Sequence, residues 1–259
     1  MPTPRSFAEL ADLLNNRYKR YACPAFIDGD PIQVPHGFKG KHDIEISALL
    51  AATFAWGSRK SIVNSARRLM DIMGNEPYQF VVNFSKADEY RLQGFVHRTF
   101  SAADAVQFMY LLRHIYHHLG GLEQVFAAGY RKNQSVSGAI QAYRDVFVSC
   151  EVPTHTLRHV PNVAAGAAAK RINMFLRWMV RPATEGVDFG IWSAIPTSAL
   201  LIPLDLHTGR VARKLGLLQR KNDDFKAVIE LTEALRQFDS ADPVKYDYAL
   251  FGLGLHEKF

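Results

Sequence analysis

A carboxylate lies directly ahead of a short basic helix in residues 203–217, which read Pro-Leu-Asp-Leu-His-Thr-Gly-Arg-Val-Ala-Arg-Lys-Leu-Gly-Leu. Asp205 occupies the expected N-cap, where its side chain accepts backbone N–H bonds and the positive end of the helix dipole stabilises its charge. Gly216 marks the expected end of the helix. Three cationic residues between Asp205 and Gly216 suit phosphate groups: Arg210, Arg213 and Lys214. The pattern indicates chemistry on a nucleic acid, although an ordinary capped helix would give it too.

The pattern Asp-x-His-x-x-Arg-Val-x-x-x-Leu-Gly, after an apolar stretch ending in proline, resembles the segment of the helix-hairpin-helix DNA glycosylases that carries their essential aspartate. This superfamily includes endonuclease III and the archaeal oxidised-guanine glycosylases. The resemblance implies that Asp205 assists cleavage of the bond between a damaged base and its sugar. His207 would donate to a phosphate or orient Asp205, or would only pack locally. Arg210 would clamp a phosphate, and Arg213 and Lys214 would add general attraction to DNA.

A candidate amine follows the sequence Val-Pro-Asn-Val-Ala-Ala-Gly-Ala-Ala-Ala-Lys at residues 160–170. This stretch partly resembles the Leu-Pro-Gly-Val-Gly-x-Lys hairpin of relatives that also nick the DNA backbone through a Schiff base. The resemblance implies that Lys170 is the nucleophile. Asn162 and Ala164 replace two of the hairpin glycines, and a phosphate-binding or solvated lysine explains Lys170 equally well.

Basic residues are concentrated around these two positions. The expected helix at 167–181 would pack its apolar face and leave Lys170, Asn173, Arg177 and Arg181 together on a cationic face. Between Lys170 and Lys221 the chain has nine basic and three acidic residues, which contain the whole net charge of +6. We therefore expect Arg177 and Arg181 to contact DNA, although a merely solvated basic face is the alternative.

Residues 44–69 are similar to the early helix pair of the same superfamily, with a turn between the helices. In those enzymes the turn presents a side chain that fills the gap left by an extruded base. Trp56 falls at this turn, where its ring could stack into such a gap. Because the preceding residues are almost wholly apolar, a buried core tryptophan is the alternative.

Helical periodicity dominates the chain and predicts an all-α protein without a substantial sheet. The resemblance implies that its helices form a two-lobed bundle of the helix-hairpin-helix glycosylase type. Residues 1–259 would form one unit with approximate lobes at 43–181 and at 1–42 plus 182–259. Residues 23–41 are the exception, and their turn chemistry indicates an irregular connection or a small hairpin. We expect helices near 6–21, from 101, and near 43–56, 59–73, 122–130, 136–149, 167–181, 206–215, 223–238 and 243–251, the last with Asp242 as its N-cap.

Composition excludes several classes of protein. The chain has only two cysteines, Cys23 and Cys150, so it cannot bind a four-cysteine iron–sulfur cluster. His114, His117 and His118 fit an exposed polar face better than a metal site, so we expect no metal and no cofactor. No apolar run is long enough to span a membrane, and the first ten residues have no signal-peptide core. We expect a cytoplasmic monomer that does not contact membranes.

Our first hypothesis is a DNA-binding base-excision enzyme that cleaves N-glycosidic bonds, with lyase activity at the abasic site if Lys170 attacks the sugar. The alternative is a noncatalytic nucleic-acid-binding protein that kept the scaffold. A regulatory helical protein is a third hypothesis, and it predicts no salt-dependent affinity for DNA. The resemblance is specific only around Asp205, so we also expect an uncharacterised bacterial family.

Overall fold

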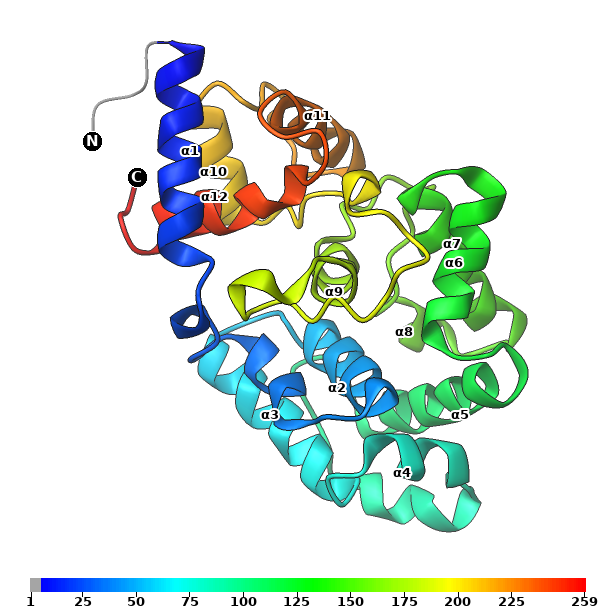
Figure 1. Cartoon of the computed structure of the whole chain (residues 1–259). Helices are drawn as coiled ribbons and strands as arrows, with labels where there is room; N and C mark the ends of the chain where they lie inside the picture. Colours follow the sequence, from blue (N-terminus) through cyan, green and yellow to red (C-terminus); the bar gives the residue numbers. More distant parts are fainter. Residues whose placement is uncertain (1–5) are drawn as a thin grey trace. The chain divides into compact units, whose positions relative to one another are not determined.

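The computed structural model describes residues 6–259 and is all-helical over that range (Figure 1). The described residues contain no strand, and the single isolated β-bridge joins His97 to Phe100. The all-α prediction is therefore confirmed, whereas the glycosylase-type arrangement stays a prediction. Residues 1–5, which belong to a predicted lobe and to the segment searched for a signal peptide, lie outside the described range.

Most expected helices are present with ends shifted by a few residues. The twelve α-helices of the described range are α1 (Phe7–Tyr21), α2 (Lys41–Thr53), α3 (Arg59–Ile72), α4 (Pro77–Asn83), α5 (Ala102–His118), α6 (Leu122–Asn133), α7 (Val136–Ser149), α8 (Thr154–Leu157), α9 (Lys170–Val180), α10 (Leu206–Lys214), α11 (Phe225–Arg236) and α12 (Tyr246–Leu255). Helices α4 and α8 are not among those predicted, because they are too short to show a clear period.

The chain divides into two compact units. The terminal unit combines the chain up to Asp28 with Val163–Phe259, and the middle unit is Gly29–Asn162. The lobes expected from the sequence have other limits, since α9 was placed with the middle of the chain and belongs to the terminal unit.

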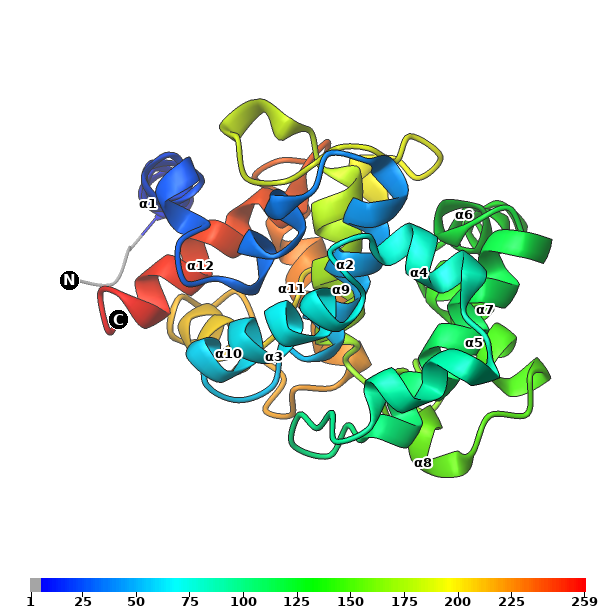
Figure 2. The same cartoon turned by 90° about the horizontal axis from the view of Figure 1, so that it is seen from below.

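In the terminal unit, α12 packs against α1 and α10. Figure 1 shows α1 crossing α12, and Figure 2 looks nearly down the axis of α1 beside α12. Two glycines of α12 allow these helices to approach closely. A Cβ on Gly252 would lie 2.1 Å from the ring of Tyr21 on α1, and one on Gly254 would lie 3.0 Å from Cβ of His207 on α10. The Gly-Leu-Gly sequence is thus a packing element.

In the middle unit, α6 and α7 form the most extensive helix pair, and they lie side by side in both views (Figures 1 and 2). Gly129 permits this contact, because a Cβ there would lie 2.5 Å from Cβ of Ala142. Helix α4 packs on α5 and α2. The irregular connection expected at 23–41 contains three 3-10 turns, each beginning with a proline: Pro24–Phe26, Pro31–Gln33 and Pro35–Gly37.

Helix caps follow the sequence closely at two sites. The Ser6 side chain accepts the Glu9 N–H, and Ser101 and Asp104 form a reciprocal capping box at the start of α5. Asp242 and Pro243 take the predicted positions, but at the start of the 3-10 turn Pro243–Lys245 that precedes α12, and the Asp242 side chain makes no cap hydrogen bond. The Asp242 carboxylate instead binds Arg181. An ion pair to a buried guanidinium replaces the cap there.

Candidate functional site

Asp205 caps α10 as predicted. Its backbone is extended (φ −123°), and its Oδ1 accepts the Thr208 N–H at 2.9 Å. The side chain is half-buried, so one carboxylate oxygen is held by the helix and the group still reaches solvent. A carboxylate fixed in this way faces the positive end of the helix dipole. This geometry suits a group that must stabilise developing positive charge.

An exposed stripe follows Asp205 along α10 at a spacing of four residues: Leu206, Arg210 and Lys214. Leu206 is 80% exposed, although leucine is usually buried. Arg210 donates from Nη2 to the Gly254 carbonyl at 2.9 Å, and the Lys214 ammonium lies 4.3 Å from the centre of the Phe259 ring. Both cations remain exposed on this surface. Leu206 is not among the residues predicted from the sequence, because its only signal there is a place between two polar residues.

His207 and Arg213 contribute mainly to packing in the terminal unit. The His207 ring meets Phe251 of α12 edge to face with the centroids 6.2 Å apart. Arg213 donates from Nε to the Arg220 carbonyl at 2.8 Å and pairs with Asp223 at 2.5 Å. These contacts favour the local-packing alternative for His207, and they partly neutralise Arg213.

Lys170 is the first residue of α9 and is half-buried. The preceding Ala169 has a left-handed backbone (φ 54°), and its carbonyl accepts the Asn173 N–H at 2.9 Å. A turn precedes it, in which the Gly166 N–H donates to the Val163 carbonyl. The Gly166 carbonyl accepts the N–H of Phe225, which joins this turn to the start of α11. The turn fixes the position at which Lys170 enters the helix.

Arg177 and Arg181 do not form the exposed cationic face that the sequence predicts. Their side chains are 3% and 2% exposed, and each is surrounded by acids of the terminal unit. Arg177 pairs with Asp188 and Asp247, whereas Arg181 pairs with Asp188 at 2.5 Å and with Asp242 at 2.8 Å. This corrects the expectation that the two arginines contact DNA, because their charges are already compensated inside the fold.

Two aromatic residues complete this buried network. The Tyr248 hydroxyl donates to Asp188 at 2.8 Å, and the Arg177 guanidinium lies 4.3 Å from the centre of the Tyr248 ring. The Tyr18 hydroxyl donates to Glu185 at 2.5 Å and accepts from Arg181. Although burial lowers the pKa of Arg177, Tyr248, Asp188 and Asp247 raise it above its usual value. Both arginines therefore stay charged.

Asp247 is the acid of this network that lies on α12. Burial raises the pKa of Asp247 to about 6, although Arg177 lowers it. Asp205 also raises this pKa and Lys170 lowers it. Helix α12 packs against α10, which Asp205 caps, and the Arg177 partner of Asp247 lies on α9, which begins at Lys170.

Two fully buried polar atoms lie one helical turn beyond these groups. Asn173 Oδ1, on the turn after Lys170, and Thr208 Oγ1, on the turn after Asp205, have no hydrogen-bond partner within residues 6–259. Buried polar atoms in native proteins nearly always have a partner, either protein or water. A buried water is the usual partner of such atoms.

Trp56 lies in the middle unit, in the turn between α2 and α3, and it is 47% exposed. The core-tryptophan alternative is therefore wrong. The Arg98 guanidinium lies 4.2 Å from the centre of the Trp56 ring, and Gly57 (φ 122°) lets this side chain pass close to the turn. Trp178 and Trp192 are both buried. Trp56 is thus the single exposed tryptophan.

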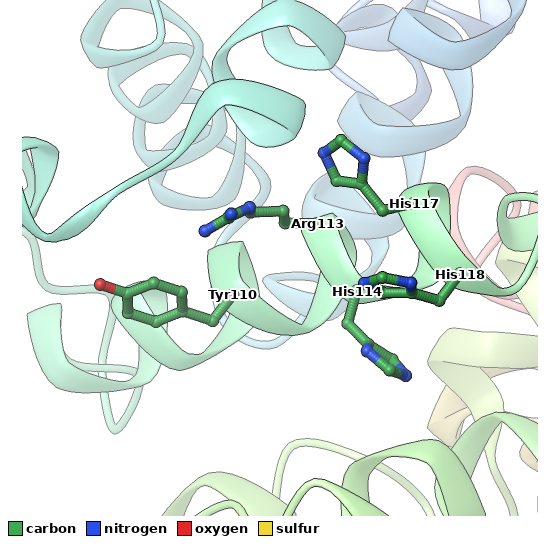
Figure 3. Close-up of a pocket in the computed structure, with 5 residues that line it drawn as sticks. All are labelled: Tyr110, Arg113, His114, His117 and His118. Atoms are coloured by element: carbon green, nitrogen blue, oxygen red, sulfur yellow. The ribbon is translucent and has the colours of Figure 1, made fainter.

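The histidines of α5 line an open pocket of about 350 Å³ together with Tyr110 and Arg113 (Figure 3). The rings of His114 and His118 have centroids 5.0 Å apart, and Nε2 of His117 lies 2.8 Å from the Val82 carbonyl. Within residues 6–259, no group of three or more histidine, cysteine or acidic side chains is arranged to hold a metal ion.

None of the helices in residues 6–259 has the length and apolar character that crossing a bilayer requires. No curated protein and no solved structure matches the chain. The family model described as "Protein of unknown function (DUF2400)" matches residues 30–256, which include Trp56, Lys170 and Asp205. The match covers nearly the whole sequence, and the chain belongs to this family.

Proposed function

We propose that the protein is a base-excision enzyme that binds DNA and cleaves the N-glycosidic bond of a damaged base. The observation that carries this proposal is the geometry of Asp205: its carboxylate caps α10 through the Thr208 N–H and is half-buried, on a helix that exposes Arg210 and Lys214. A carboxylate fixed in this way can stabilise an oxocarbenium-like sugar, and an amine such as that of Lys170 can attack it. The resemblance of residues 203–217 to the glycosylase segment supports the same chemistry.

In the proposed reaction, the unprotonated Lys170 amine forms a bond to C1′ of the sugar while the bond from C1′ to the base breaks. The departing base keeps the electron pair of that bond and takes up a proton. The amine then loses a proton, and the ring oxygen gains one as the sugar opens to a protonated Schiff base. Asp205 offsets the positive charge that develops on the sugar. Where Lys170 does not attack, Asp205 activates a water instead.

The exposed stripe of α10 supplies the DNA contacts in this proposal. Arg210 and Lys214 neutralise phosphates, and their contribution weakens with salt through counterion release. Leu206 gives an apolar contact to a sugar or base beside Asp205. In the middle unit, Trp56 offers a stacking surface for an unpaired base, with Arg98 as the adjacent cation.

Borohydride trapping on a panel of oligonucleotides with different damaged bases tests the enzymatic claim. The reagent reduces the Schiff base to a stable secondary amine, so the wild-type protein should form a covalent adduct that Lys170→Met abolishes. Asp205→Asn should slow base release by about 100-fold or more. Asp224→Asn is the matched control, because Asp224 caps α11 in the same unit through the Ala227 N–H and should not affect the rate.

The noncatalytic DNA-binding alternative is favoured by the replaced hairpin glycines at Asn162 and Ala164. It predicts salt-dependent binding that survives Asp205→Asn, with no adduct and no base release on any lesion. That outcome would refute the enzymatic proposal. Absence of DNA affinity at low salt would refute both.

A further inference from the structure

A tight turn of the middle unit places an arginine in a backbone conformation that favours glycine. The His97 N–H donates to the Phe100 carbonyl at 2.8 Å, and the Phe100 N–H donates to the His97 carbonyl at 2.9 Å. Arg98 occupies the first corner between them with a left-handed backbone (φ 54°). Glycine or asparagine is the usual residue at such a corner, because a larger side chain is strained there. The strain indicates that Arg98 has a role outside the packing of the turn.

The Arg98 side chain lies against an exposed tryptophan of the same unit. Its guanidinium lies 4.2 Å from the centre of the Trp56 ring, and Trp56 is nevertheless 47% exposed. The neighbouring His97 is buried, and its Nδ1 lies 2.9 Å from Oγ of Ser65 on α3. This bond attaches the turn to α3, so the turn holds Arg98 at a defined position beside Trp56.

Two further arginines bind the backbone of the loop that contains this turn. Arg68 of α3 donates from Nη2 to the Gly94 carbonyl at 3.1 Å, and Arg158 donates from Nη2 to the Thr99 carbonyl at 3.3 Å. Both arginines are exposed. Gly94 and Thr99 are five residues apart, so their backbones lie within about 18 Å of each other. We call the three cationic residues at this loop the arginine surface: Arg68, Arg98 and Arg158.

The arginine surface has no acidic partner among residues 6–259. Its guanidinium groups contact carbonyl oxygens and aromatic rings, and none of them is in an ion pair of that range. The buried Arg177 and Arg181 of the terminal unit, by contrast, each pair with two or more acids. Because a carbonyl group has no net charge, the positive charges of the arginine surface are not compensated and suit an anion with several charges along its length.

We propose that the arginine surface binds the phosphates of a single DNA strand while an unpaired base of that strand stacks on Trp56. The inference rests on the proposed function and names its substrate class, which is DNA with unpaired bases, such as a bubble within a duplex. Guanidinium groups bind phosphate oxygens through paired N–H bonds. A span of about 18 Å corresponds to about five nucleotides of one strand, at 3.4 Å each.

The exposed tryptophan distinguishes a single strand from a duplex as the partner. An aromatic side chain stacks on a base only where the face of that base is free, and stacking is tolerant of sequence because every base has such a face. Arg98 covers part of the Trp56 ring, and the exposed remainder can meet a base. Paired bases inside a regular duplex would leave Trp56 without a contact.

Fluorescence anisotropy at a series of salt concentrations tests the arginine surface. An undamaged single strand should bind more tightly than the duplex of the same sequence. Arg68→Gln and Arg158→Gln should each weaken binding of the single strand about fivefold and reduce the slope of log K against log salt by about 0.7. Arg67→Gln is the matched control, because Arg67 is the neighbour of Arg68 on α3 but donates to the Gln33 side chain. It should leave affinity and slope unchanged.

Arg98→Gly separates DNA binding from a merely structural role. Glycine removes the strain at the positive φ, so this variant should keep the melting temperature of the wild type or exceed it, yet bind the single strand about fivefold more weakly. A structural role predicts a lower melting temperature with unchanged affinity. That result would remove Arg98 from the arginine surface and overturn the inference.

Intrinsic fluorescence tests the stacking, because the other two tryptophans of the chain, Trp178 and Trp192, are buried. The single strand should quench the emission of the wild type, and Trp56→Phe should abolish the quenching. Tight binding of the duplex with no preference for the single strand would overturn the inference, as would equal affinities of the glutamine variants and Arg67→Gln. In either case base release by the wild type would still support the proposed function. If the wild type releases no base while the arginine variants lose affinity, the proposed function fails and the inference holds.

Discussion

Asp247→Asn should change how the stability of the terminal unit depends on pH. The folded protein raises the pKa of this carboxyl from 3.8 to about 6, mainly through burial, so the folded state binds a proton more tightly than the unfolded chain does. Stability from this group is therefore fully present below about pH 3.8 and is lost as the pH rises through about 6. A difference of about two pKa units corresponds to about 3 kcal/mol.

The substitution keeps the size of the side chain but removes its titration. Between about pH 4 and pH 7, the free energy of unfolding of the wild type should fall by about 3 kcal/mol relative to that of Asp247→Asn. Carboxylates with lowered pKa values, such as Asp104 and Glu257, change the free energy of unfolding with pH in the opposite direction. Both proteins contain these groups, so their contributions cancel in the difference between the wild type and the variant.

Urea unfolding at a series of pH values measures this difference, since the slope m reports whether the unfolded state has changed. Asp12→Asn, at an exposed position on α1 of the same unit, is the control and should follow the wild-type profile. Parallel stability curves for the wild type and Asp247→Asn would refute the reasoning. So would a wild type that gains stability relative to the variant as the pH rises.

Two further substitutions test packing and the exposed stripe. Gly252→Ala should destabilise the protein by about 2 kcal/mol or more, since the new Cβ would lie 2.1 Å from the ring of Tyr21. Gly37→Ala is the control and should not destabilise it, because there is open space around Gly37. Equal melting temperatures for the two variants would contradict the close approach of α12 to α1. Leu206→Ser should leave stability within about 0.5 kcal/mol of wild type, because the side chain is 80% exposed, yet weaken binding of a damaged duplex in a fluorescence anisotropy assay. Val148→Ser, at another exposed apolar position, is the control and should leave the affinity for DNA unchanged. Equal affinities of the two serine variants would show that Leu206 does not contact DNA.

The parts of the fold that sequence predicts well are those determined by neighbours in the chain. A helix cap needs only a side chain and an N–H three residues later, so Ser6, Ser101 and Asp205 could be assigned from local pattern alone. At Asp242 the predicted position is right but the side-chain cap bond is absent, because a guanidinium 61 residues earlier competes for the carboxylate. Local rules give the site of a cap only where no distant partner offers a stronger bond.

The candidate site shows the same contrast between features determined by nearby residues and features determined by distant ones. Asp205 and the exposed cations of α10 could be predicted, because a capped helix determines which residues follow on one face. The burial of Arg177 could not, since one of its acidic partners, Asp247, lies 70 residues away. The apolar and charged faces of α9 are periodic, but periodicity does not say whether a charged face meets solvent or a set of acids.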